Sequence, residues 1–201
     1  MLPVLKNALG DITGLLGFIT DADKGWPLAR GPLGPQIFRE PLVRQLNDRI
    51  GCRQNGLRGI ETIVFSTRLT RITPYLRRRN IDAALQLVSD TVQDWSGGTK
   101  IGACLQEFNA TMAANMVTSK TLVIIISDGW DTGDTAVLDT AMARLRRIAL
   151  RVIWLNPLLG SANYQPLCKG IQTALPYVHD FLPVHNVESL RQFGHLVASL
   201  I

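Results

Sequence analysis

Residues 121–134, TLVIIISDGWDTGD, contain the pattern that is most informative about the fold. Its first half is a continuous apolar run rich in β-branched residues, which is typical of a strand buried on both faces of a sheet. The run stops at Ser127-Asp128-Gly129, and Asp131 and Asp134 follow before a helical pattern begins. A strand that ends in a cluster of carboxylates raises the question of what those carboxylates hold.

Strand-like and helical patterns alternate from residue 60 to the C-terminus. We expect strands at 60–66, 68–73, 121–127, 150–156 and 177–184. We expect helices after Asn80, at 101–112, after Asp134, at 164–174 and after Asn186. This alternation predicts an α/β fold with a doubly wound, mostly parallel sheet and helices on both faces. Because the second strand follows the first almost at once, it is predicted to be an antiparallel edge strand.

The first 59 residues have a different character. We interpret 1–59 as a divergent N-terminal segment and 60–201 as the main domain. Within the segment, a first strand is expected in 11–20, ending at Asp21. Residues 24–36 are too rich in Gly and Pro for a helix or an interior strand, so a loop is expected there. A short helix is expected at 41–50, with Pro41 at its first position.

Composition limits the class of protein. The chain has 201 residues, 46% of them hydrophobic, which is enough for one domain with a sizeable core. Cys52, Cys104 and Cys168 are odd in number and lack zinc-ligand spacing, so we expect reduced thiols and a cytoplasmic protein. No apolar run approaches the roughly 18 residues of a membrane span, and no integral membrane segment is predicted.

The net charge of +5 comes partly from two basic groups. Phosphate binding, a solvated basic face and an acidic protein partner could each explain them. No aromatic stacking motif is interleaved with the arginines, so we predict no nucleic-acid partner. The groups are Arg68, Arg71, Arg77, Arg78 and Arg79, and Arg144, Arg146, Arg147 and Arg151.

Two loops that should lie at the carboxyl ends of strands carry hard oxygen donors. Thr99 belongs to SGGT, residues 96–99, and Asp128 belongs to SDGWD, residues 127–131. Mg²⁺ prefers oxygen ligands and uses few carboxylates, so these two side chains are plausible ligands. The structural alternative is that Thr99 caps a helix starting at Lys100 and that Asp128 satisfies loop amides.

Three segments of the chain contain the motifs DWSGGT (94–99), SDGWD (127–131) and WLNPL (154–158). Together these segments resemble the CoxE-like branch of the von Willebrand factor A (VWA) domain proteins, from about Glu61 to the C-terminus. The resemblance implies a Rossmann-like VWA fold. It also implies that Thr99 and Asp128 lie on two of the three loops of the metal-ion-dependent adhesion site (MIDAS) of that family, with Mg²⁺ as the cofactor. On the same loops, the predicted partner-binding residues are Ser96, Ser127, Trp130 and Asp131.

The third loop departs from the family pattern, which has Asp-x-Ser-x-Ser after the first strand. The best positional substitute is Asp21, with Asp23 where the first serine would fall. Both are predicted as metal ligands of an incomplete site. Either the site is degenerate, or residues 1–59 are foreign to the domain through truncation, fusion or a frameshift.

The resemblance implies a protein-interaction module without catalytic activity. Its expected partner is a MoxR-type AAA+ ATPase, and its expected role is the maturation of a molybdenum hydroxylase such as carbon monoxide dehydrogenase. The alternative is a Mg²⁺-dependent phosphohydrolase of the haloacid dehalogenase type, with Asp21 as nucleophile and Asp23 as general acid. The sequence leaves the client enzyme and the oligomeric state open.

Overall fold

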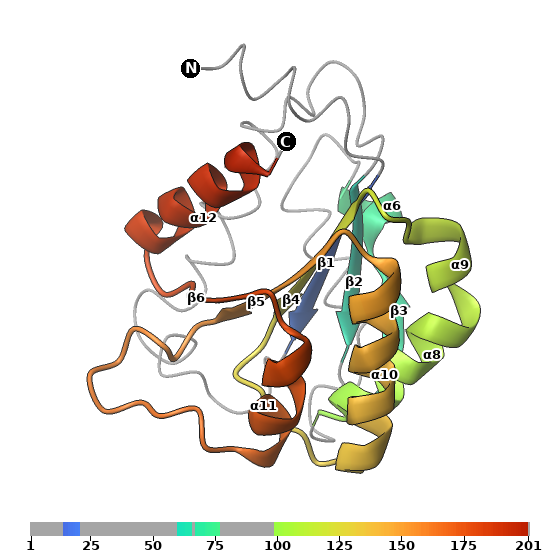
Figure 1. The fold of residues 1–201 in the computed structure, drawn as a ribbon, viewed down its shortest axis with the longest axis horizontal. Helices are drawn as coiled ribbons and strands as arrows, with labels where there is room; N and C mark the ends of the chain where they lie inside the picture. Colours follow the sequence, from blue (N-terminus) through green and yellow to red (C-terminus); the bar gives the residue numbers. More distant parts are fainter. Residues whose placement is uncertain (1–13, 21–59, 66, 77–98, 201) are drawn as a thin grey trace.

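The computed structural model describes residues 14–20, 60–65, 67–76 and 99–200. These residues contain a six-stranded sheet with the order β3-β2-β1-β4-β5-β6 (Figure 1). The neighbouring strands run parallel except for β2 and β3, which are antiparallel. The predicted α/β fold with one antiparallel edge strand is therefore confirmed. The strands are β1 (Gly14–Thr20), β2 (Ile60–Phe65), β3 (Leu69–Arg71), β4 (Thr121–Ile126), β5 (Arg151–Asn156) and β6 (Asp180–Pro183).

The segment before residue 60 supplies a central strand. β1 lies between β2 and β4, with Leu15 opposite both Ile60 and Leu122, and its last residue, Thr20, opposite Phe65. Sequence order reverses on either side of β1, which is where doubly wound sheets bind ligands. The expected loop at 24–36, the helix at 41–50 and the helix after Asn80 lie outside the described residues.

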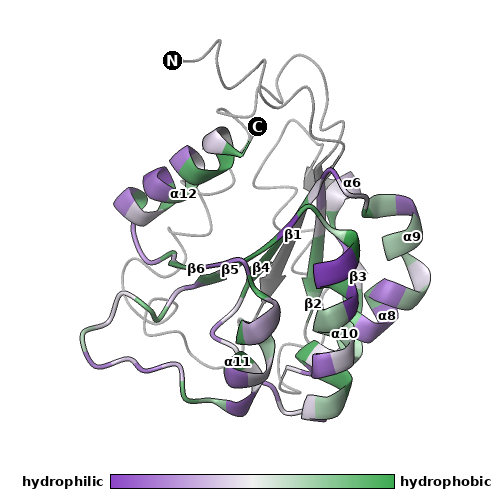
Figure 2. Cartoon of the chain, in the orientation of Figure 1, coloured by the Kyte–Doolittle hydropathy of each residue, from purple (hydrophilic) through white to green (hydrophobic). Residues whose placement is uncertain are grey.

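Helices cover both faces of the sheet (Figure 1). α8, α10 and α11 pack on one face, and α12 packs on the other. Figure 2 shows the apolar strands between these helical layers, with hydrophilic residues on the outer sides of the helices. The helices are α6 (Thr73–Leu76), α8 (Ile101–Thr111), α9 (Ala113–Met116), α10 (Thr135–Ile148), α11 (Lys169–Ala174), the 3₁₀ helix η1 (Leu175–Tyr177) and α12 (Val187–Ser199).

All six residues of β4 are buried, as the apolar run predicted. Because side chains alternate along a strand, Val123 and Ile125 pack in the larger core with α8 and α10. Leu122, Ile124 and Ile126 pack in the second core with α12. The buried strand thus fixes the position of Ser127 and Asp128, which follow it directly.

Two predicted helix caps are confirmed. The Asp134 carboxylate accepts a hydrogen bond from the Ala136 amide (2.8 Å) at the start of α10. The Asn186 side chain accepts one from the Ser189 amide (2.8 Å), and the Ser189 hydroxyl accepts one from the Asn186 amide (3.1 Å) at the start of α12. Such caps satisfy amides that have no partner inside the helix.

Two predicted elements are shorter than expected. The helix predicted at 164–174 begins at Lys169, because Pro166 has no amide hydrogen and disfavours helical geometry at the residue before it. The strand predicted at 177–184 begins at Asp180, because Tyr177 still belongs to the 3₁₀ helix Leu175–Tyr177, which has Pro176 in its first turn. In both places a proline ended the pattern that the neighbouring residues suggested.

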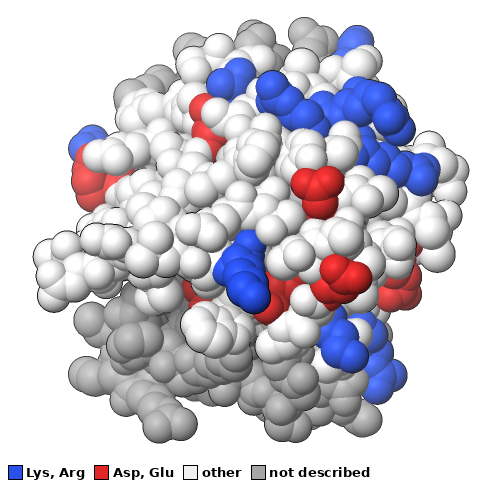
Figure 3. Space-filling view, turned by 60° about the horizontal axis from the view of Figure 1, so that its bottom comes forward, with Lys and Arg blue, Asp and Glu red and all other residues white. Residues whose placement is uncertain are grey.

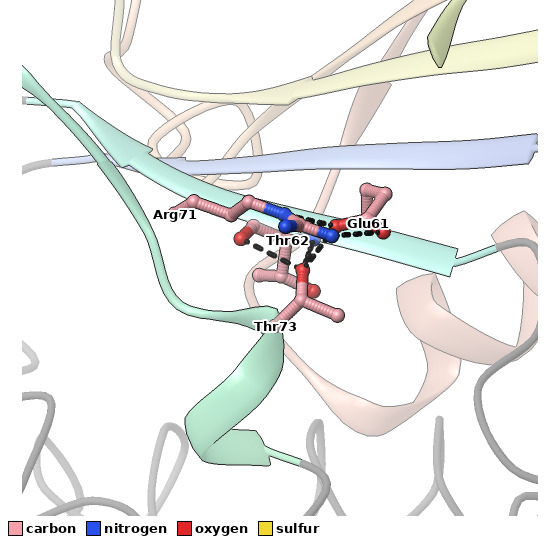
Figure 4. Close-up of polar contacts among 4 residues, drawn as sticks. All are labelled: Glu61, Thr62, Arg71 and Thr73. Carbon is pink, nitrogen blue, oxygen red and sulfur yellow. Dashed lines mark hydrogen bonds and ion pairs between the residues drawn. The ribbon is translucent and has the colours of Figure 1, made fainter. Parts of the chain in front are cut away.

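The edge strand β3 is held to β2 by a polar network (Figure 4). Arg71 donates two hydrogen bonds to the Glu61 carboxylate, each 2.7 Å long. The Thr73 hydroxyl donates to the same carboxylate (2.7 Å) and accepts from the Thr62 amide (2.7 Å). The strand expected at 68–73 ends early because Thr73 already begins α6.

No helix in the described ranges combines the length and the apolar character that crossing a membrane requires.

Candidate functional site

The candidate site lies at the carboxyl ends of β1 and β4, where two loops from distant parts of the sequence meet. The backbone oxygen of Thr99 accepts hydrogen bonds from the Thr132 amide (2.9 Å) and from the Thr132 hydroxyl (3.0 Å). Thr99 therefore lies at the same edge of the sheet as the loop that contains Asp128. Thr99 is buried, with 2% of its surface exposed.

The Asp131 carboxylate joins these loops. It accepts hydrogen bonds from the amides of Ile101 (3.0 Å) and Gly102 (3.2 Å), which are the first two residues of α8. It also accepts one from the Gly133 amide (2.8 Å). A carboxylate in this position satisfies amides at a helix start and complements the helix dipole. Lys100 is the N-cap residue, and its side chain makes no capping bond, so Asp131 provides that function from another loop.

Ser127 and Asp128 form the turn at the end of β4. The buried Ser127 hydroxyl accepts a hydrogen bond from the Gly129 amide (3.0 Å), and its carbonyl accepts one from the indole of Trp154 (2.9 Å). The Asp128 Oδ1 accepts from the Trp130 amide (2.9 Å).

The last residue of β5 and two residues that follow the strand support this turn through hydrogen bonds. The amide group of the fully buried Asn156 donates to the Tyr164 hydroxyl (2.8 Å), which in turn donates to the Asp128 carbonyl (3.3 Å). The Cys168 thiol donates to the Gly129 carbonyl (3.2 Å). Burial raises the pKa of both Tyr164 and Cys168, which keeps them protonated as donors at neutral pH.

No motif in the sequence indicates this supporting group. Asn156 comes just before Pro157, which indicates only a turn. Tyr164 and Cys168 have no distinctive spacing, and their contacts with the Asp128 turn appear only when β5 is placed beside β4.

Two glycines permit the close packing. Gly129 has a φ angle of +82°, a backbone conformation that residues with a side chain rarely adopt. A Cβ atom on Gly170 would lie 2.3 Å from the Gly129 carbonyl oxygen and 2.8 Å from the Asp131 Cβ. The start of α11 therefore packs directly against the loop after β4.

Two large apolar side chains are exposed beside the site. Trp130 is 53% exposed and Leu167 is 64% exposed. Trp130 follows Gly129 in the chain and Leu167 precedes Cys168, and Gly129 and Cys168 are joined by a hydrogen bond. Exposed apolar residues next to polar groups are typical of an interaction surface.

The described residues fit a divalent ion only in part. Thr99 and Asp128 offer hard oxygen atoms of the kind that Mg²⁺ prefers. Within the described ranges no group of three His, Cys, Asp or Glu residues could hold a metal ion. Asp21 and Asp23, and the predicted partner residue Ser96, lie outside the described residues, although Asp21 directly follows Thr20 in the chain. The roles of Ser127, Trp130 and Asp131 in partner binding remain predictions.

Comparison with known families identifies the fold and the family. Residues 51–190, most of the chain, match the family described as "VWA domain containing CoxE-like protein". The chain belongs to this family. The predicted resemblance to CoxE-like VWA proteins is thus confirmed. VWA domains are typically non-catalytic interaction modules. The alternative phosphohydrolase depends on Asp21 and Asp23, and the family match does not extend to them.

Solved structures share the VWA fold at low sequence identity. Proximal thread matrix protein 1 from the mussel byssus is 15% identical, with a TM-score of 0.59 over 94% of this chain and 48% of the mussel chain. This chain therefore spans about half the length of that protein. A second structure of the mussel protein, 16% identical with a TM-score of 0.56 over 94% of this chain and 47% of that one, has a zinc-occupied MIDAS motif.

Two further solved structures share the fold. An aerotolerance-related membrane protein from Bacteroides fragilis is 15% identical, with a TM-score of 0.54 over 94% of this VWA chain and 100% of the other. The TRAP protein of Plasmodium vivax, solved loaded with manganese, is 14% identical, with a TM-score of 0.51 over 93% and 74% of the two chains. No curated protein sequence matches this chain.

Proposed function

We propose that this VWA domain is an accessory factor that binds a MoxR-type AAA+ ATPase in the cytoplasm. Together they would mature a molybdenum hydroxylase such as carbon monoxide dehydrogenase. Membership of the CoxE-like family supports this proposal. The observation that carries it is the meeting of the Thr99 and Asp128 loops at one edge of the sheet, beside the end of β1.

In this proposal a divalent ion is held by Thr99 and Asp128, with Asp21 and Asp23 as further ligands. A carboxylate of the partner would complete the coordination. The metal-occupied sites of the mussel and Plasmodium proteins support a divalent ion of this kind, and Mg²⁺ is the one we propose. Bound metal would make capture of the partner dependent on the ion.

Contacts around the ion would supply the rest of the binding energy. Trp130 is proposed as the central anchor because its large side chain is exposed on a loop fixed by the Asp128 and Ser127 turns. Ser96, Ser127 and Asp131 are proposed as polar neighbours of that anchor. Asp131 would act mainly by holding α8 and the Trp130 loop in place.

The test is capture of the purified MoxR-type ATPase of the same organism, in Mg²⁺ and in EDTA. We expect Asp128→Asn to weaken capture about tenfold or more in Mg²⁺, since losing an ionised ligand weakens metal binding at least as much as losing an outer contact. Asparagine retains an oxygen that can accept from the Trp130 amide, so the loop should keep its shape. In EDTA the two proteins should behave alike.

The matched control is Asp134→Asn, which removes a carboxylate from the same loop but one that caps α10. It should leave Mg²⁺-dependent capture unchanged. Titration of each protein with Mn²⁺, followed by electron paramagnetic resonance, tests the ion separately. Equal capture by the wild type and Asp128→Asn in Mg²⁺ would remove the ion from the mechanism.

A further inference from the structure

We propose that the C-terminal end of α10 forms a second docking surface, which binds an acidic, amphipathic segment of a partner protein. We call it the basic surface, and it consists of Lys120, Arg144, Arg146, Arg147 and Leu150. It is separate from the candidate metal site.

The four cations of the basic surface are exposed. Within the part of the chain that the structure describes, Lys120, Arg144, Arg146 and Arg147 make no ion pair. Figure 3 shows Lys and Arg side chains gathered in a band on one part of the molecular surface, with few acidic residues among them. Such a band attracts a partner of opposite charge.

Nearby acidic residues are already engaged. The Asp180 carboxylate pairs with Arg151. The Asp139 carboxylate, on the same helix, accepts a hydrogen bond from the Tyr177 hydroxyl (2.6 Å). These two contacts leave the four cations of the basic surface without a described acidic neighbour that neutralises them.

Lys120 and Leu150 bring a second segment and an apolar group into the surface. The Leu150 amide donates to the Thr121 carbonyl (2.9 Å), which places the loop before β4 beside the end of α10. Leu150 is 45% exposed. Cations near a helix C-terminus also stabilise the helix dipole, which accounts for Arg146 and Arg147. That effect explains neither Lys120 nor the exposed leucine.

The mixture of charge and aliphatic surface favours protein over nucleic acid. Proteins that bind single-stranded nucleic acid combine cations with aromatic rings on which bases stack. The large apolar side chain exposed here is Leu150, which cannot stack. An amphipathic segment with glutamate or aspartate beside leucine would match both components of the surface.

The two docking surfaces lie at opposite ends of one helix. α10 begins after Asp134, beside the candidate metal site, and ends at Ile148. With 14 residues it is roughly 21 Å long at 1.5 Å per residue. Changes at the basic surface should therefore leave metal-dependent capture intact, and the two proposals can fail separately.

The probe for the test is a fluorescein-labelled peptide of glutamate and leucine, with the leucines at helical spacing. Binding is measured by fluorescence anisotropy at low ionic strength. We expect the triple variant Arg144→Gln, Arg146→Gln, Arg147→Gln to bind about tenfold more weakly, from the combined loss of several exposed ion pairs. Glutamine is a good helix former, so α10 should persist, which circular dichroism checks.

The matched control carries the same change in net charge at exposed cations elsewhere: Lys100→Gln, Lys169→Gln and Arg191→Gln. It should bind the peptide like the wild type, and so should Asp128→Asn. Leu150→Ser should weaken binding of the glutamate-leucine peptide about threefold but not that of polyglutamate, because only the former buries leucine.

Three results would overturn the proposal. The first is no binding of the peptide by the wild type. The second is equal loss in the triple variant and its control, which would mean that net charge alone is responsible. The third is tighter binding of a single-stranded RNA, or of phosphatidylserine vesicles, than of the peptide, which would assign the surface to another class of partner.

Discussion

At its amino end, α10 begins where the loop after β4, the start of α8 and the start of α11 are held together by hydrogen bonds. Asp131 accepts from three amides there, and Gly170 lies against the Gly129 carbonyl. At its carboxyl end the same helix is surrounded by exposed cations and the partly exposed Leu150. The amino end therefore depends on exact backbone positions, and the carboxyl end depends mainly on charge.

This difference predicts how each end responds to substitution. Loops that share hydrogen bonds and close contacts should lose stability when a single atom is added or an acceptor is removed. Exposed side chains at the other end can change with little effect on folding, because they bury little area and make no ion pair within the described ranges.

The largest effect is expected from Gly170→Ala. The new Cβ would lie 2.3 Å from the Gly129 carbonyl oxygen, and neither backbone can move without separating α11 from the site. We expect the free energy of unfolding to fall by about 3 kcal/mol, measured by urea denaturation. The control is Gly194→Ala in α12, where no atom lies within 4 Å of the added carbon. That variant should be stabilised by about 0.5 kcal/mol, and equal effects at the two glycines would contradict the contrast.

A smaller loss is expected from Asp131→Ala. Removing this carboxylate leaves the amides of Ile101, Gly102 and Gly133 without their acceptor. We expect a loss of about 2 kcal/mol in thermal or urea denaturation. Asp134→Ala removes an exposed cap that accepts from one amide of the described residues, that of Ala136, and it should cost about 1 kcal/mol. If Asp131→Ala lowered the free energy of unfolding no more than Asp134→Ala does, the inference that Asp131 joins the two loops would be wrong.

The smallest effect is expected from protonation of His179, near the carboxyl end of α10. Burial, and then the charges of Arg146 and Arg151, lower the pKa of His179 below its usual value near 6.5. The ring Nδ1 accepts from the Val152 amide (2.9 Å), which requires the unprotonated form. As the pH falls below about 6.5, the unfolded chain binds a proton that the folded chain resists. Stability should therefore be highest above that pH and should decrease toward the folded-state pKa.

His179→Asn is the matched variant, because its side-chain oxygen can accept from the same amide. Between about pH 7 and 5 it should lose less stability than the wild type, which denaturant titrations at each pH would measure. Carboxylates such as Glu188, whose pKa the Arg191 hydrogen bond lowers, act mainly below about pH 4.5. An identical pH profile for the two proteins above pH 5 would show that His179 does not contribute.

Elements that are formed by residues close together in the sequence could be predicted from the sequence. The apolar run of β4, the cap residues Asp134 and Asn186, and the stripe of α10 were predictable because neighbouring residues produce them. The helix expected at 164–174 was wrong in its first part because a proline outweighed the apolar spacing. The edge position of β3 was predictable because its short connection to β2 leaves little choice of partner.

The candidate site was predictable only in part. Thr99 and Asp128 could be proposed as neighbours since the carboxyl ends of parallel strands share one edge. Asp131 was predicted to contact a partner, whereas in the structure its carboxylate also joins two loops through amides distant in sequence. Asn156, Tyr164 and Cys168 gave no indication of their part in supporting the Asp128 turn.

The α/β class, most strands and helices of the described ranges, and the family resemblance follow from the sequence alone, because periodicity, caps and short motifs are local properties of the chain. The folded chain shows in addition that β1 is central, that Asp131 caps α8, and that Lys120 and Leu150 lie with the arginines at the end of α10. These features depend on contacts between segments far apart in the chain. No local pattern encodes them, because each forms only after the sheet has set the order of its strands.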